Sequence, residues 1–157
     1  PDLVSRERYT AKIFNSIFCE DSSSRVYQEI REKRGLAYAI LGMLDQEKGY
    51  GESLIYAGTL KEKLETVKKI ILSEFEKMSK VTEKDLKKTK EKLINLNILE
   101  KEDSKNVLMN LLLEGVAGRA EEYYQYEQNI NSVKLQDVRR LAKLKNYSMF
   151  SLVPKKN

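Results

Sequence analysis

Residues 21–40 join a short charged helix to a β-strand through one glycine, and this junction constrains the fold more than any other part of the sequence. The segment opens with Asp21 and three serines, whose short side chains can accept hydrogen bonds from the free amides at a helix start. Gly35 follows the charged run and suits the left-handed position that ends many helices. The apolar and aromatic residues after it favour a strand. The segment therefore predicts a capped helix that leads into a strand, with Arg31 and Tyr38 on either side of the junction.

Apolar residues at helical spacing dominate the rest of the chain, and one alternating pair of segments separates them. The predicted helices are residues 6–18, a short helix ending near residue 34, and residues 60–80, 82–100, 104–126 and 133–145. The predicted strands are residues 36–44, 53–58 and 147–153, with a turn at residues 45–51. Thr82 and Asp85 have the spacing of a capping box, and Ser104 can cap the next helix. Gly115 and Gly118 interrupt that helix and predict a kink or a close helix contact.

The order of these elements predicts an α+β fold. A few strands can bury one face only when helices pack on it, so we expect an antiparallel sheet with a layer of long helices on one face. The 157 residues suit one domain, residues 1–157, which can bury about 70% of its unfolded surface.

Composition excludes several classes of function. The chain has no histidine, and Cys19 is its only cysteine, so neither an internal disulfide nor a cysteine metal cluster can form. The net charge of +5 arises from 29 basic and 24 acidic residues that are interspersed, which is typical of a solvated surface rather than of nucleic-acid binding. No apolar run approaches the roughly 20 residues of a membrane span, and no signal peptide is visible, so we expect no membrane partner and a cytoplasmic location. The sequence also lacks G-x-S-x-G, P-loop and G-x-G-x-x-G motifs.

The run S-S-R-V-Y-Q-E-I-R-E-K-R-G-L-A-Y, residues 23–38, resembles the signature of the C-terminal domain of the pitrilysin and mitochondrial processing peptidase family, whose members are zinc metallopeptidases. Weaker matches at residues 54–59, 81–86 and 132–142 extend the resemblance over nearly the whole chain. The resemblance implies a processing-peptidase-like domain that lacks its first strand, which should precede Arg6. It also implies that the chain is a fragment of a longer two-domain protein.

The resemblance further implies a function. In the family, an arginine and a tyrosine of this domain reach across a closed chamber toward zinc held by the N-terminal domain, and the matching residues are Arg31 and Tyr38. They would bind the substrate and stabilise the oxyanion that forms when a peptide carbonyl is attacked. Family members bind zinc through histidines, so we expect the zinc to lie outside this chain and the chain alone to be inactive. The expected partners are an N-terminal zinc-bearing domain or a homologous subunit, and a peptide substrate.

Other interpretations remain open from the residues alone. A charge run around Arg31 is normally a solvated helix face, and Tyr38 in a strand is normally a half-buried aromatic with its hydroxyl at the rim. Arg34 competes with Arg31, since it is closer in sequence to Tyr38 and suits the negative end of the helix dipole. The chain also fits a non-catalytic peptide-binding or scaffold subunit of the same family. An unrelated helical binding module would leave the motif unexplained.

Overall fold

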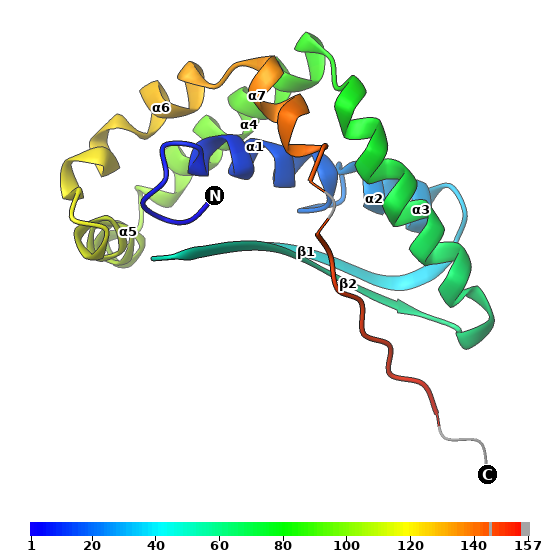
Figure 1. Cartoon of the computed structure of the whole chain (residues 1–157). Coiled ribbons are helices and arrows are strands. Elements are labelled where there is room, and N and C mark those ends of the chain that lie inside the picture. The colour runs from blue at the N-terminus through cyan, green and yellow to red at the C-terminus, as the bar shows by residue number, and fades with distance from the viewer. Residues whose placement is uncertain (145, 155–157) are drawn as a thin grey trace.

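The computed structural model describes residues 1–144 and 146–154, and it shows helices arched over one face of a β-hairpin (Figure 1). This arrangement confirms the predicted α+β fold with an antiparallel sheet covered by helices on one face. The α-helices are α1 (Arg8–Phe18), α2 (Arg25–Tyr27), α3 (Leu64–Lys77), α4 (Glu83–Glu100), α5 (Ser104–Val116), α6 (Tyr126–Ser132) and α7 (Leu135–Leu141). The strands are β1 (Ala37–Glu47) and β2 (Tyr50–Thr59). A π-helical segment η1 (Gln28–Glu32) and 3₁₀ turns η2 (Lys61–Lys63), η3 (Met78–Lys80) and η4 (Ala120–Gln125) complete the elements.

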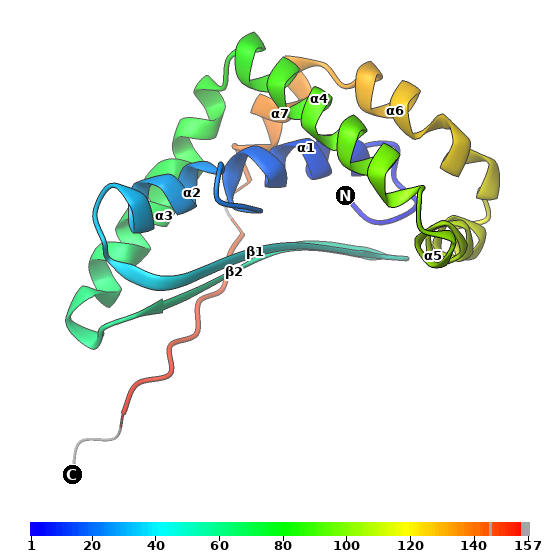
Figure 2. The same ribbon diagram turned by 180° about the vertical axis from the view of Figure 1, so that it is seen from behind.

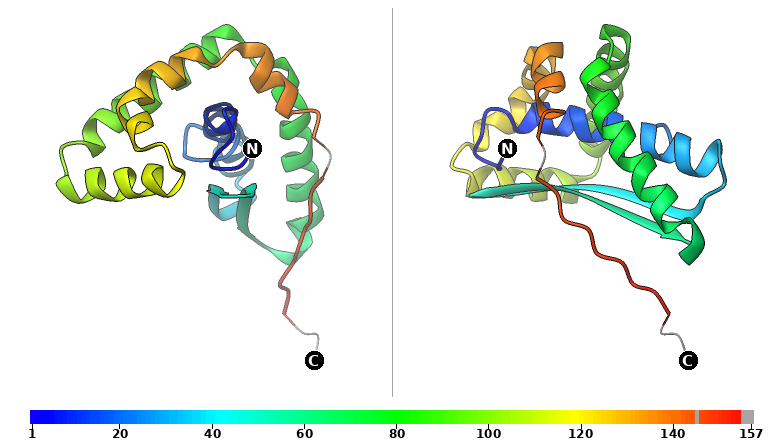
Figure 3. Two further views of the ribbon diagram at one scale, coloured as in Figure 1. Left: turned by 60° about the vertical axis from the view of Figure 1, so that its left-hand side comes forward. Right: turned by 45° about the vertical axis from the view of Figure 1, so that its right-hand side comes forward.

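Helix α1 is the centre of the core. It lies between the hairpin and an outer layer of helices, as Figure 3 shows in a view with α1 nearly end-on. Figure 2, which is the view from behind, shows α4 crossing α1. Every residue of α1 except Lys12 is buried, because neighbours cover it on both sides. Ile13 is fully buried, and the rings of Phe14 and Phe18 meet Phe75 of α3 at 5.4 and 5.5 Å between centroids. Edge-on aromatic contacts of this kind add about 0.5–1.5 kcal/mol to the burial of the rings.

The hairpin is longer than the sequence predicted. Strands β1 and β2 pair in antiparallel register up to Glu47 and Tyr50, so the predicted turn at residues 45–51 is wrong except for Lys48 and Gly49. Gly49 has φ +96°, which allows a two-residue turn that only a residue without a Cβ adopts at low cost. The strands can therefore extend into sequence whose charge and glycine content had predicted a loop.

The inner face of the hairpin packs closely on α1. A Cβ on Gly42 would lie 2.2 Å from the carbonyl oxygen of Cys19, just after the end of α1. The Ser53 hydroxyl donates a 2.6 Å hydrogen bond to Asn15 Oδ1 of the same helix. The side chains on this face therefore point toward the helices, and their alternating neighbours point away from them.

Local capping sets the ends of the later helices. Thr82 and Asp85 form the predicted capping box at the start of α4, with each side chain accepting from the other residue's backbone N–H at 3.0–3.2 Å. The cap of α5 is Asp103 rather than Ser104, and it accepts from the Lys105 N–H at 2.9 Å. The helix ends at Val116, and Gly118 with φ +75° follows in a turn.

The predicted closing strand at residues 147–153 is wrong. The sheet of the described residues contains β1 and β2 alone, and residues 146–154 form an extended, exposed segment that we call the tail (Figure 1). Alternating β-prone residues form a strand only where the segment packs into a half-buried sheet, and the tail is exposed instead. None of the described helices has both the length and the apolar character needed to cross a bilayer.

Candidate functional site

Arg31 lies on a π-helical turn that the sequence did not predict. The turn continues α2, and in it the Lys33 N–H donates to the Gln28 carbonyl five residues earlier at 3.0 Å. Such turns are rare and occur often at functional sites. No residue type in the segment signals a π-turn, because the same side chains also suit an ordinary α-helix.

Backbone hydrogen bonds end this helical segment shortly after Arg31. Gly35 has φ +56°, as the sequence predicted, and its N–H donates to the Arg31 carbonyl at 3.1 Å. The Leu36 N–H donates to the Ile30 carbonyl at 2.9 Å. Because Val26 and Ile30 are fully buried, they hold one side of the helix in the core and leave Arg31 on the exposed side.

Arg31 and Arg34 differ in their ionic partners. Arg34 pairs with Glu29 at 3.1 Å, and Lys33 pairs with the same carboxylate. The Lys33 ammonium, together with Arg34, holds the pKa of the Glu29 carboxyl below its usual value. Within the described residues no ion pair involves Arg31, whose guanidinium lies 5.3 Å from the ring centroid of Tyr27. Arg31 is therefore the arginine whose donors are available to a ligand.

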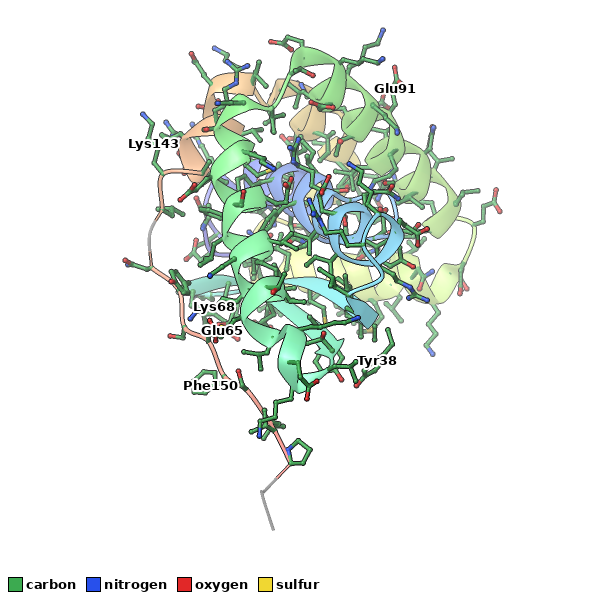
Figure 4. All side chains as sticks on the ribbon, turned by 90° about the vertical axis from the view of Figure 1, so that its right-hand side faces the viewer. Tyr38, Glu65, Lys68, Glu91, Lys143 and Phe150 are labelled. Carbon is green, nitrogen blue, oxygen red and sulfur yellow. The ribbon has the colours of Figure 1, made fainter. Side chains whose placement is uncertain are left out.

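Tyr38 projects from the opposite side of the same junction. It is the extra residue of a β-bulge, since Ala37 pairs with Thr59 and Ala39 pairs with Gly58. Its side chain is 69% exposed, more than the half-buried position expected of a strand tyrosine, and Figure 4 shows it outside the helical layer. Its ring covers Gly58, where a Cβ would lie 2.5 Å from the ring atoms. The glycine thus provides the space in which the tyrosine rests.

The structure brings Arg31 and Tyr38 to adjacent elements, since η1 contacts β1 directly. The Thr59 hydroxyl donates to the Leu36 carbonyl at 2.5 Å and ties the junction to β2. Among the described residues no hydrogen bond joins the two side chains to each other. A guanidinium fork and a phenol hydroxyl together can donate to a carbonyl or carboxylate oxygen.

The donor set of this chain does not fit a zinc ion. Zinc sites use histidine, cysteine and carboxylate ligands, and the sequence has no histidine. Burial raises the pKa of the Cys19 thiol to about 12, which disfavours the thiolate that binds metal. The part of the chain that the structure describes contains no group of three such residues placed to hold a metal.

Comparison with known proteins identifies the family. The model of the family described as "Peptidase M16 inactive domain" matches residues 1–93, which include the Arg31–Tyr38 junction. The chain belongs to this family. Its membership confirms the resemblance drawn from residues 23–38 and identifies the chain as an M16 inactive domain.

The chain is also similar to curated proteins that are named as zinc proteases. The chain is 26% identical to an uncharacterized zinc protease of Bacillus subtilis, over 98% of the chain and 39% of the relative. It is 38% identical to an uncharacterized zinc protease of Rickettsia felis, over 57% of the chain and 22% of that protein. The chain therefore spans well under half the length of the curated relatives it matches.

Solved structures share the fold. A protease from Helicobacter pylori superposes with a TM-score of 0.80 at 23% identity, covering 90% of this chain and 35% of that one. The peptidase M16 inactive domain from Pseudomonas fluorescens superposes with a TM-score of 0.76 at 22% identity, covering 92% and 36%. These superpositions confirm the processing-peptidase-like architecture.

Proposed function

We propose that this chain is the substrate-side domain of a zinc-dependent endopeptidase that hydrolyses peptide bonds. In this proposal residues 1–157 are one domain of a longer two-domain protein, and zinc is held by the N-terminal domain or by a homologous subunit. Membership of the M16 family supports the reaction class. The observation that carries the role of this domain is that the donors of Arg31 are available and that Tyr38 is exposed, on two elements that contact each other.

The two side chains would act on the carbonyl oxygen of the peptide bond that is cleaved. This oxygen gains negative charge as the carbonyl carbon is attacked, and donors that already point at it need little rearrangement. Arg31 supplies a permanent positive charge with several N–H donors, and Tyr38 supplies one O–H donor. Loss of one such donor commonly costs about 3 kcal/mol of transition-state stabilisation.

Substitution of the two residues in the complete enzyme tests this role. We expect Arg31→Ala and Tyr38→Phe each to lower kcat/KM for a peptide by at least about tenfold, since each removes a donor from the developing oxyanion. We expect the melting temperature to change little, because both side chains are exposed. Arg34→Ala is the matched control, since it removes an arginine of the same segment that is already paired with Glu29.

Two results would contradict the proposal. Equal losses of activity and stability in Arg31→Ala would indicate that the arginine holds the fold. Unchanged turnover in both variants, with peptide binding retained, would favour a non-catalytic peptide-binding or scaffold subunit.

A further inference from the structure

The face of the hairpin that points away from the helices is apolar and exposed. We call it the outer face. The register places Leu41 opposite Tyr56 and Met43 opposite Leu54, so these side chains share one surface. They are between 43% and 59% exposed, and Tyr38 lies at the end of the same face. Grouped apolar side chains of this kind mark an interaction surface more often than scattered ones do.

Contacts with α1 identify the inner face of the hairpin without reference to these exposures. Gly42 contacts the Cys19 backbone, and Ser53 bonds to Asn15 of α1, so the residues between them in the alternation must point outward. Figure 1 shows the helices gathered on the inner side of β1 and β2. The outer face is therefore separate from the core.

Charge is distributed unevenly along the outer face. Asp45 and Glu52 are direct cross-strand partners near the turn, and Glu47 follows on the same face. Like charges placed directly opposite each other destabilise a hairpin unless a cation lies nearby. No ion pair involves these three carboxylates among the residues described, and only the Tyr50 hydroxyl donates to Asp45, at 3.1 Å. That hydrogen bond and the surrounding carboxylates raise the pKa of Tyr50.

The other end of the outer face carries Tyr38, whose ring lies over Gly58. The face thus runs from Tyr38, over an apolar middle, to an acidic end at the turn. A bound partner of matching character would present an apolar side chain and then a cation.

We propose that the outer face selects the sequence of the peptide substrate, an inference that rests on the proposed function. The preferred peptide carries a bulky apolar side chain over Leu41 and Tyr56, and a lysine or arginine about four residues further toward the hairpin turn. Leu41 and Asp45 are four residues apart in β1, which corresponds to about 13 Å at the rise of a strand. An extended peptide has the same rise, so one residue spacing brings both of its side chains onto their partners.

Binding of short labelled peptides to the isolated chain tests this inference without requiring catalysis. The reference peptide carries one leucine and one lysine four positions apart in a serine–glycine background, and fluorescence anisotropy measures its Kd. We expect replacement of its lysine by glutamate to weaken binding severalfold. We also expect a reference peptide whose two residues are adjacent to bind more weakly than one with the proposed spacing.

Variants of the chain identify the surface. We expect Leu54→Ser to weaken binding of the reference peptide about fivefold, since part of an apolar contact is lost. We expect Glu52→Lys to weaken binding of the lysine peptide by about threefold, because exposed ion pairs contribute modestly. We expect the same substitution to strengthen binding of the glutamate peptide. Leu108→Ser is the control, since Leu108 is similarly exposed on α5 but lies off the hairpin.

The outcomes separate this inference from the proposed function. Peptide binding that ignores spacing and charge would overturn the inference, and a loss of turnover in Arg31→Ala would still support the proposed function. If sedimentation instead shows that the chain self-associates and Leu54→Ser makes it monomeric, the outer face is an interface between copies and the inference is wrong.

Discussion

At the scale of single residues, two glycines of the hairpin serve opposite faces. Gly42 faces inward, and a Cβ there would meet the backbone of Cys19, which cannot move without shifting α1. Gly58 faces outward, and a Cβ there would meet the ring of Tyr38, which can swing into solvent. The same substitution should therefore have different consequences at the two positions.

We expect Gly58→Ala to leave stability nearly unchanged. If the proposed function holds, the substitution also lowers turnover of the complete enzyme, since it displaces Tyr38 from its position. Gly42→Ala is the matched comparison, and we expect it to lower the free energy of unfolding by about 1–3 kcal/mol through overpacking. Urea denaturation and peptide turnover measure the two effects. A large loss of stability in Gly58→Ala would show that the ring of Tyr38 is fixed in place.

At the scale of elements, α5 depends on a buried ion pair rather than on apolar packing. None of its residues is buried, although it is rich in leucine. Arg8 of α1, which is 5% exposed, contacts Glu114 of α5 at 2.7 Å and Glu122 of η4 at 2.8 Å. Arg119 also pairs with Glu122 at 3.1 Å, so Glu114 is the carboxylate that relies on Arg8.

We expect Arg8→Met to release α5 and η4 from the core, because it leaves Glu114 partly buried without its cation. Breaking a buried pair in this way costs about 3–5 kcal/mol. Hydrogen exchange of residues 104–125 should accelerate by at least a hundredfold, while that of α4 changes little. Lys33→Met, which breaks an exposed pair, is the control. Equal acceleration throughout the chain would contradict a local role for Arg8.

The elements also show what the sequence could predict. The α4 capping box and the Gly35 helix end were predicted correctly, because both depend on neighbours within a few residues. The hairpin turn was predicted too long, since Gly49 shortens it through a backbone angle that composition does not reveal. The strand at residues 147–153 was wrong because strand formation requires a partner edge far away in sequence.

The candidate site was predicted only in part. The resemblance selected Arg31 and Tyr38, but the residues alone could not separate Arg31 from Arg34. In the structure Glu29 pairs with Arg34 and not with Arg31, at the five-residue spacing of the π-helical turn, and the choice of Arg31 stays a prediction. The exposure of Tyr38 depends in turn on the bulge and on Gly58, which lies twenty residues away.

At the scale of the whole molecule, the chain exposes more surface than a compact protein of its mass. Its accessible area is 10591 Å² for 18.3 kDa, whereas compact monomers of this mass expose about 8,100 Å². The excess exceeds the roughly 800 Å² that one partner contributes to a standard interface. Helix α5 and the tail contribute to it, and Figure 4 shows Phe150 of the tail pointing away from the body.

This excess suits a domain that is covered by a partner, and the proposed function identifies the partner as the zinc-bearing domain. A ligand that binds only the folded chain stabilises it by about 2.7 kcal/mol at a hundredfold excess over Kd. For a chain of this size we therefore expect the melting temperature to rise by about 5–10 °C when the zinc-bearing domain is added, as differential scanning fluorimetry can measure.

The tail provides the control for this titration. Phe150 is 93% exposed, so we expect Phe150→Ser to leave the melting temperature of the isolated chain unchanged. If the partner covers the tail, the same substitution reduces the shift that the partner induces. An unchanged melting temperature at saturating zinc-bearing domain would contradict the proposed pairing, because a partner that covers this surface must stabilise the fold that presents it.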